Sequence, residues 1–194
     1  LPFALAAGGF LALHFACWIT SLSYTSVAAS TALVTTNPVW VTLLGWWLFG
    51  ERPSFLTLLG VGVALLGGVL IGLGDSEGGG GANPLLGDFL ALLGAVAASC
   101  YFLLGREAQR RGLSTWAYVR VAYTAAALLL LPLPYLFGGG YGGYPLEVYA
   151  YLLLMALLPQ LVGHTSFNWA TRHIPPVLVT LAILFEPVGA SLLA

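Results

Sequence analysis

The sequence predicts an all-α fold, a polytopic bundle of transmembrane helices, from its composition and from the length of its apolar runs. Of the 194 residues, 59% are apolar and only 7% are charged, and the mean hydropathy is +0.94. Soluble domains typically carry about 25% charged residues. A chain with so few charged side chains cannot cover a water-exposed surface. Its solvent is therefore predicted to be lipid.

Seven apolar runs of spanning length follow one another along the chain. A bilayer core requires roughly 20 residues of helix, and each run is close to that length. An unpaired peptide group in lipid costs several kcal/mol, and the runs lack the period-2 alternation of barrel strands, so each is predicted to be a helix. The runs are Pro2–Ser21, Val27–Leu48, Phe55–Leu73, Leu85–Leu104, Trp116–Phe137, Leu146–Thr171 and Pro176–Ala194.

The loop charges predict how these helices are oriented. Arginines occur after the second, fourth and sixth runs, whereas the alternate loops are glycine-rich and acidic. Because positively charged loops stay in the cytoplasm, the arginine loops are predicted to be cytoplasmic and the segment Gly78–Gly81 external. The arginines concerned are Arg52, Arg106, Arg110, Arg111 and Arg172.

Two of the runs contain a proline at corresponding positions. The surrounding sequences align without a gap at an offset of 149 residues, so that Asn37-Pro38-Val39 corresponds to Glu186-Pro187-Val188. Proline removes a backbone donor and frees the carbonyl four residues earlier, here Val34 and Ile183. A duplicated pair of interrupted membrane helices indicates a transporter binding site near the bilayer midplane.

The repeat is predicted to be inverted. Its unit contains five spans, and an odd number of crossings places the two copies in opposite orientations. Residues 1–74 would then form the last three helices of the first repeat, and residues 85–194 the first four helices of a truncated second repeat. Two further spans before Leu1 and one after Ala194 would make ten helices in the intact protein, seven of them visible here.

Five short motifs, spread over nearly the whole chain, carry a family resemblance. They are Tyr24-Thr25-Ser26-Val27-Ala28-Ala29, Asn37-Pro38-Val39, Leu48-Phe49-Gly50-Glu51-Arg52, Trp169-Ala170-Thr171-Arg172 and Glu186-Pro187-Val188. With these motifs the chain resembles the drug/metabolite transporter (DMT) superfamily. The likeness is to helices three to nine of its EamA-like ten-helix transporters.

This resemblance implies a multi-pass protein of the bacterial inner membrane. It would be a secondary transporter that exports amino acids or other small metabolites by alternating access. Its partners would be a small-molecule substrate and the lipid bilayer. The substrate differs between members of the family, so the resemblance names none, and it leaves open whether the carrier is a homodimer.

Polar residues of the sixth and first runs are candidates for binding a substrate. Gln160, His164 and Asn168 follow one another at intervals of four and share a helix face. Such a stripe either lines a cavity or clamps two helices by hydrogen bonds, and the sequence leaves both open. His14 and Trp18 lie one turn apart, where they either help to hold an apolar substrate or pack in the core.

The interrupted helices supply the remaining candidates. Asn37 and Trp40 share a face of the second run beside its proline, and Glu186 occupies the position equivalent to Asn37. A charged carboxylate near mid-span is costly, so Glu186 is predicted to bind a proton or a substrate amine, or else to make a structural hydrogen bond. Pro38 and Pro187 are predicted to act as a pair of gates.

A seven-helix membrane sensor or receptor and an intramembrane enzyme are the alternative functions. All six basic residues are arginine, so there is no lysine to hold a retinal cofactor. The histidines lack a spacing such as H-E-x-x-H, and the two cysteines offer no zinc spacing. We therefore expect a protein that is not an enzyme, with no cofactor, no metal and no nucleic-acid partner.

Overall fold

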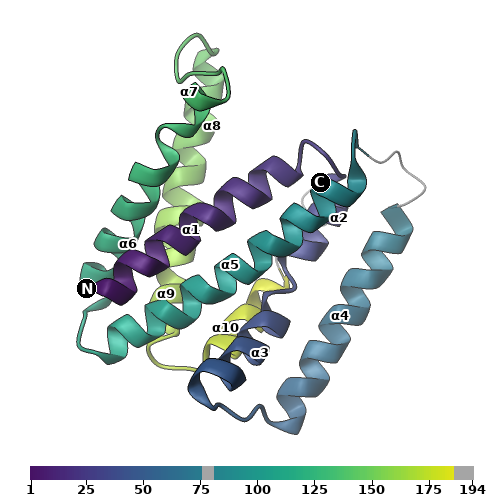
Figure 1. Cartoon of the computed structure of the whole chain (residues 1–194), viewed down its shortest axis with the longest axis vertical. Coiled ribbons are helices and arrows are strands. Elements are labelled where there is room, and N and C mark those ends of the chain that lie inside the picture. Colours follow the sequence, from purple (N-terminus) through teal and green to yellow (C-terminus); the bar gives the residue numbers. More distant parts are fainter. Residues whose placement is uncertain (76–80, 186–194) are drawn as a thin grey trace.

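The structure, a computed structural model, describes residues 1–75 and 81–185, and these residues are mostly helical (Figure 1). No strand occurs among them, which confirms the predicted all-α fold. The helices are α1 (Pro2–Ser21), α2 (Val27–Val34), α3 (Asn37–Phe49), α4 (Phe55–Asp75), α5 (Pro84–Arg110), α6 (Thr115–Leu130), α7 (Leu133–Leu136), α8 (Leu146–Met155), the π-helix η1 (Ala156–His164), α9 (Thr165–Ala170) and α10 (Pro176–Ile183).

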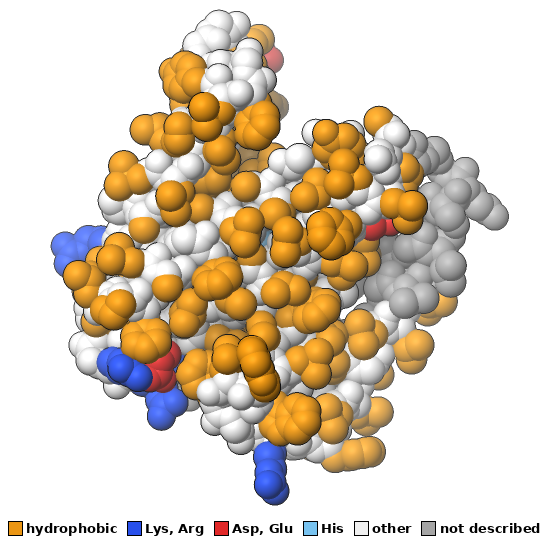
Figure 2. Space-filling model, viewed as in Figure 1, with side chains coloured by type: hydrophobic (Ala, Val, Ile, Leu, Met, Phe, Trp, Pro, Cys, Tyr) orange, Lys and Arg blue, Asp and Glu red, His pale blue; other side chains and the backbone are white. Residues whose placement is uncertain are grey.

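Five helical segments are long and apolar enough to cross a membrane, and they coincide with five of the predicted runs. They are Pro2–Ser21, Val27–Phe49, Pro84–Arg110, Thr115–Leu136 and Leu146–Ala170. Helix α4 covers the third run, and α10 begins the seventh, whose remainder lies outside the described residues. Hydrophobic side chains are spread over all the helices visible in Figure 2, and the arginines lie at the edges of that view. The chain is a multi-pass membrane bundle.

Helix α1 packs against both α5 and α6. Small residues on α1 allow this close approach. At Gly8, an added Cβ would lie 2.6 Å from the carbonyl oxygen of Ala122 and 2.7 Å from the Cβ of Ala125, so a larger residue would push α6 away. The buried side chains around this contact include Ala4, Ala7, Leu11, Tyr101, Phe102 and Tyr118.

The second span is interrupted where its proline predicts. Helix α2 ends at Val34 and α3 begins at Asn37, with Pro38 in its first turn. Thr35 and Thr36 form the turn between the two helices. Their hydroxyl groups donate to carbonyl oxygens of the last turn of α2, at 2.8 and 2.6 Å. Both oxygens also accept from the backbone N–H groups of Thr35 and Thr36, so the hydroxyls add a second bond at the end of α2.

The sixth span contains a second interruption, which we did not predict. Between α8 and α9, nine residues form the π-helix η1, and Pro159 lies inside it. A proline cannot donate the regular backbone bond, and π-helical turns are frequent at functional sites. The other predicted proline element, Glu186-Pro187-Val188, lies outside the described residues.

The charged loops lie at opposite ends of the bundle. We call one of them the arginine end. A surface pocket at this end is bordered by the α3–α4 loop with Arg52, the end of α5 with Arg106 and the loop before α10. At the other end, Thr25 in the α1–α2 loop donates a hydrogen bond to Asp88 on α5 at 2.8 Å. Figure 1 shows these two ends at the bottom and the top of the bundle.

A labelling experiment tests the orientation of this bundle in the membrane. With Cys17 and Cys100 replaced, single cysteines at Ala82 and at Arg110 lie at opposite ends of α5. Because the arginine end is expected to be cytoplasmic, a membrane-impermeant maleimide added to intact cells should label the cysteine at Ala82 and leave the one at Arg110 unmodified. Labelling at Arg110 from outside would reverse the orientation.

Candidate functional site

A cavity of about 430 Å³ lies in the middle of the bundle. Its walls come from α1, both halves of the interrupted second span, α5, η1 with α9, and α10. Five of the predicted substrate-binding residues line it: His14, Trp18, Asn37, Gln160 and His164. The structure thus brings polar residues of three different spans together around one space.

His14 is fixed between α1 and α5. Its Nδ1 atom lies 2.9 Å from the carbonyl oxygen of Gly94, and a carbonyl oxygen can only accept, so Nδ1 is the donor. In a neutral ring, Nε2 then remains a hydrogen-bond acceptor. The ring stacks on Trp18, with centroids 5.7 Å apart and planes inclined by 21°. His14 therefore contributes an oriented ring with one acceptor nitrogen.

His164 has the same hydrogen bonding on the wall formed by η1. Its Nδ1 donates to the carbonyl oxygen of Pro159 at 3.2 Å, which again leaves Nε2 as an acceptor. The ring lies next to Phe15 of α1 and Phe167 of α9, with centroid distances of 5.8 and 6.5 Å. Aromatic rings and imidazoles thus alternate around this part of the cavity.

Two polar atoms of the lining are buried without a hydrogen-bond partner. One is the side-chain oxygen of Asn37, a residue that is only 5% exposed, and the other is Nε1 of Trp18. The backbone of Asn37 is bonded, since Ser99 Oγ donates to its carbonyl oxygen at 3.3 Å. Both atoms expose almost no surface, so they are exceptions to the rule that buried polar groups are hydrogen-bonded.

Two other predicted residues, Trp40 and Asn168, lie outside the lining of this cavity. The indole of Trp40 donates to Thr36 at 3.1 Å, on its own span. The amide of Asn168 donates to the hydroxyl groups of Tyr101 and, at 3.3 Å, Tyr123. Asn168 thus has the geometry of the interhelical clamp that the sequence left open as an alternative. Glu186 lies outside the described residues.

Several lining residues were not among the candidates chosen from the sequence. The phenylalanines and Tyr101 were not singled out, because an apolar residue in a spanning helix can equally contact lipid, core or cavity. The π-helix could have been found, since Pro159 is a proline within an apolar run, as Pro38 is. The residues missed include Phe15, Thr31, Thr35, Tyr101, Phe102, Pro159 and Phe167.

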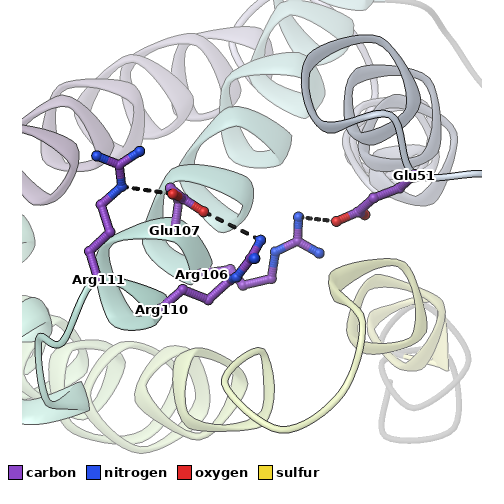
Figure 3. A network of polar contacts seen from close by, with 5 residues as sticks. All are labelled: Glu51, Arg106, Glu107, Arg110 and Arg111. Atoms are coloured by element: carbon purple, nitrogen blue, oxygen red, sulfur yellow. Dashed lines mark hydrogen bonds and ion pairs between the residues drawn. The ribbon is translucent and has the colours of Figure 1, made fainter.

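Two layers of polar contacts lie between the cavity and the arginine end. The first is the cluster around Asn168, which joins α9 to α5 and α6. The second is an ion pair of 2.5 Å between Arg106 of α5 and Glu51, just after α3 (Figure 3). Gly50 ends α3 in the left-handed conformation, with φ of 67°, and this turn places Glu51 next to α5. Arg106 is 9% exposed and lies 5.4 Å from the ring centre of Phe49.

A comparison with known families identifies the family of this chain. The family model described as "EamA-like transporter family" matches residues 1–73 and 85–194. The chain belongs to the EamA-like transporter family. This membership confirms the resemblance to the drug/metabolite transporter superfamily that the sequence motifs carry.

Three similar proteins support the assignment to this family. An uncharacterized transporter of Clostridium kluyveri is 26% identical over 177 residues, covering 90% of this chain and 57% of that protein. A probable terminal-alkyne amino-acid exporter of Streptantibioticus cattleyicolor is 27% identical, with 87% and 56% covered. An uncharacterized transporter of Synechocystis is 23% identical, with 88% and 51% covered.

The EamA-like chain spans only about half the length of these relatives, between 51% and 57%. No solved structure matches it significantly. The geometry of the cavity and its surroundings described above therefore comes from this chain alone.

The clamp around Asn168 can be tested by stability. Asn168→Leu should lower the free energy of unfolding, because it leaves the buried hydroxyl of Tyr101 unpartnered, at a cost of about 1–3 kcal/mol. Removing both partners with Asn168→Leu and Tyr101→Phe should cost less than the sum of the two single changes. Thermal unfolding in detergent measures these differences. Strictly additive effects would show that the two side chains do not interact.

Proposed function

We propose that this EamA-like protein is a secondary transporter of the bacterial inner membrane. It exports amino acids or other small metabolites by alternating access. The observation that carries this proposal is the central cavity, which is lined by polar residues of several spans inside a bundle exposed to lipid. Polar residues inside membrane spans are costly and usually mark a substrate or ion pathway. The amino-acid exporter among the similar proteins supports the choice of substrate class.

The binding residues of this carrier are those that line the cavity. His14, Asn37, Gln160 and His164 are its polar residues, and Trp18 supplies a ring face. Such sites are mostly apolar, with a few polar groups that orient the ligand, and this lining has that composition. Glu186 remains a proposed site for a proton or a substrate amine.

Alternating access follows, in this proposal, from two inverted five-helix repeats, with residues 1–74 in the first and 85–194 in the second. Pro38 and Pro187 would act as the paired gates of the two repeats. The break between α2 and α3 supports the role of Pro38, because it places a bend next to the cavity. Pro159 in η1 adds a bend on the opposite side of the same cavity.

We place the inner gate of this carrier at the arginine end. The Asn168 cluster and the Glu51–Arg106 ion pair both lie there and link helices of different spans. We therefore assign the Glu51–Arg106 pair to an inner gate, which must separate before a substrate can enter from the cytoplasm.

The role of His164 in transport can be measured by counterflow in proteoliposomes of the full-length protein with a panel of labelled amino acids and metabolites. His164→Ala removes an acceptor from the cavity and should lower the rate about tenfold, while membrane insertion is retained. His173→Ala is the matched control, because His173 makes a similar Nδ1 bond, to Trp169 at 2.9 Å, but is exposed. Normal counterflow with reduced thermal stability would make His164 a packing residue.

The inner gate can be tested by accessibility. A cysteine at Thr31, which lines the cavity, should react several-fold faster with a maleimide added from the arginine end once Arg106→Gln has removed the ion pair. Arg111→Gln is the control, since it removes the exposed pair between Arg111 and Glu107 at 2.7 Å and the contact of Arg111 with the ring of Phe3, and leaves Glu51 and Arg106 in place. An equal increase in both variants would contradict a gating role of Glu51 and Arg106.

A further inference from the structure

The arginine end carries more positive charge than its own carboxylates can balance. Its two glutamates, Glu51 and Glu107, are already paired with arginines of α5, at 2.5 to 3.5 Å. None of the ion pairs among residues 1–75 and 81–185 includes Arg52, Arg120 or Arg172, and these three side chains are exposed. They can therefore bind an anion that comes from outside the chain.

The position of Arg120 on α6 follows from that of Tyr123, which contacts α9. The hydroxyl of Tyr123 lies 3.4 Å from that of Thr165 and accepts from the amide of Asn168 at 3.3 Å. Residues three or four apart lie on the same face of a helix, so Arg120 and Trp116 continue the face of Tyr123 toward the arginine end. Both residues therefore lie on the side of α6 that turns toward α9.

A second row of residues extends from the same contact in the same direction. Trp169 and His173 follow Thr165 at intervals of four, and the centroids of their two rings lie 4.5 Å apart. Because α9 ends and α6 begins at the arginine end, both rows run along the same junction between the two helices. We call the surface formed there the α6–α9 face, which consists of Trp116, Arg120, Trp169, Arg172 and His173.

The α6–α9 face has the composition of a membrane interface. Trp116 and Trp169 are 67% and 59% exposed, and tryptophan side chains are enriched at the level of the lipid head groups. Arg120 is the sixth residue of α6, so its Cα lies about 7.5 Å deeper in the span than that of the first residue. A long arginine side chain can reach back from that depth toward the head groups. The guanidinium and the indoles can thus contact the same lipid.

We propose that the α6–α9 face binds an anionic phospholipid of the leaflet at the arginine end. Arg120 and Arg172 bind its phosphate group, since a guanidinium group matches the geometry of phosphate oxygens. Trp116 and Trp169 pack against the glycerol group and the upper part of the acyl chains. The indoles favour a lipid over a soluble anion, because a free phosphate has no apolar part to cover them. The lipid joins α6 to α9, and this role is independent of the transport function.

Titration with two lipids tests the proposal. Phosphatidylglycerol carries a net negative charge, whereas phosphatidylcholine has the same phosphate group but no net charge. With the full-length protein in detergent, native mass spectrometry should give a dissociation constant for phosphatidylglycerol at least fivefold lower than that for phosphatidylcholine. Equal constants for the two lipids would overturn the proposal.

Variants locate the site. Arg120→Gln and Arg172→Gln should each weaken the binding of phosphatidylglycerol about fivefold, the usual contribution of one arginine near anionic lipid. Arg52→Gln is the matched control, because Arg52 is also exposed and outside these ion pairs, but lies in the loop between α3 and α4. It should leave the binding unchanged. An equal loss in all three variants would show that the lipid responds only to the overall charge of this end, and would overturn the assignment.

Thermal unfolding separates a lipid from a soluble anion. A ligand that binds only the folded bundle raises its unfolding temperature. Phosphatidylglycerol should do so, and inorganic phosphate at the same concentration should not. Trp116→Ala should reduce the shift caused by the lipid, whereas Trp47→Ala, at an indole that is 78% exposed, should leave it unchanged. Equal stabilisation by inorganic phosphate, or an undiminished shift in Trp116→Ala, would overturn the assignment to a lipid.

Discussion

The absence of water in the bilayer core is the constraint on which the rest of this structure depends. Every backbone N–H and C=O group there must find a partner inside the protein, and continuous helices meet that requirement at each residue. Irregular backbone is tolerated in a membrane only where it is buried or lines a cavity. Both interruptions of the bundle, the turn between α2 and α3 and the π-helix η1, border the same cavity.

Side chains provide hydrogen bonds at both interruptions. At the first, the hydroxyls of Thr35 and Thr36 donate to carbonyl oxygens of α2. At the second, His164 donates to the carbonyl oxygen of Pro159, and Ser166 donates to that of Val162 at 2.7 Å. His164 thus bonds to the backbone of η1 and lines the cavity at the same time.

The sequence predicted the spans well and the site only in part, for a physical reason. An apolar run of about 20 residues has essentially one stable form in lipid, so its existence follows from composition. A polar residue in such a run must face protein or water, which is enough to select His14, Asn37, Gln160 and His164 as candidates. The choice between cavity and clamp depends on the neighbouring helix. Asn168 meets the hydroxyl of Tyr101 there, a contact that no local pattern indicates.

The hydrogen bond between His14 and the carbonyl oxygen of Gly94 limits how the bundle can move. It joins α1 to α5 inside the bundle, where His14 is buried. Any sliding of one of these helices along the other would have to break it. The same contact brings the two backbones close together, since a Cβ added at Gly94 would lie 3.5 Å from the carbonyl oxygen of His14 and from the backbone nitrogen of Trp18.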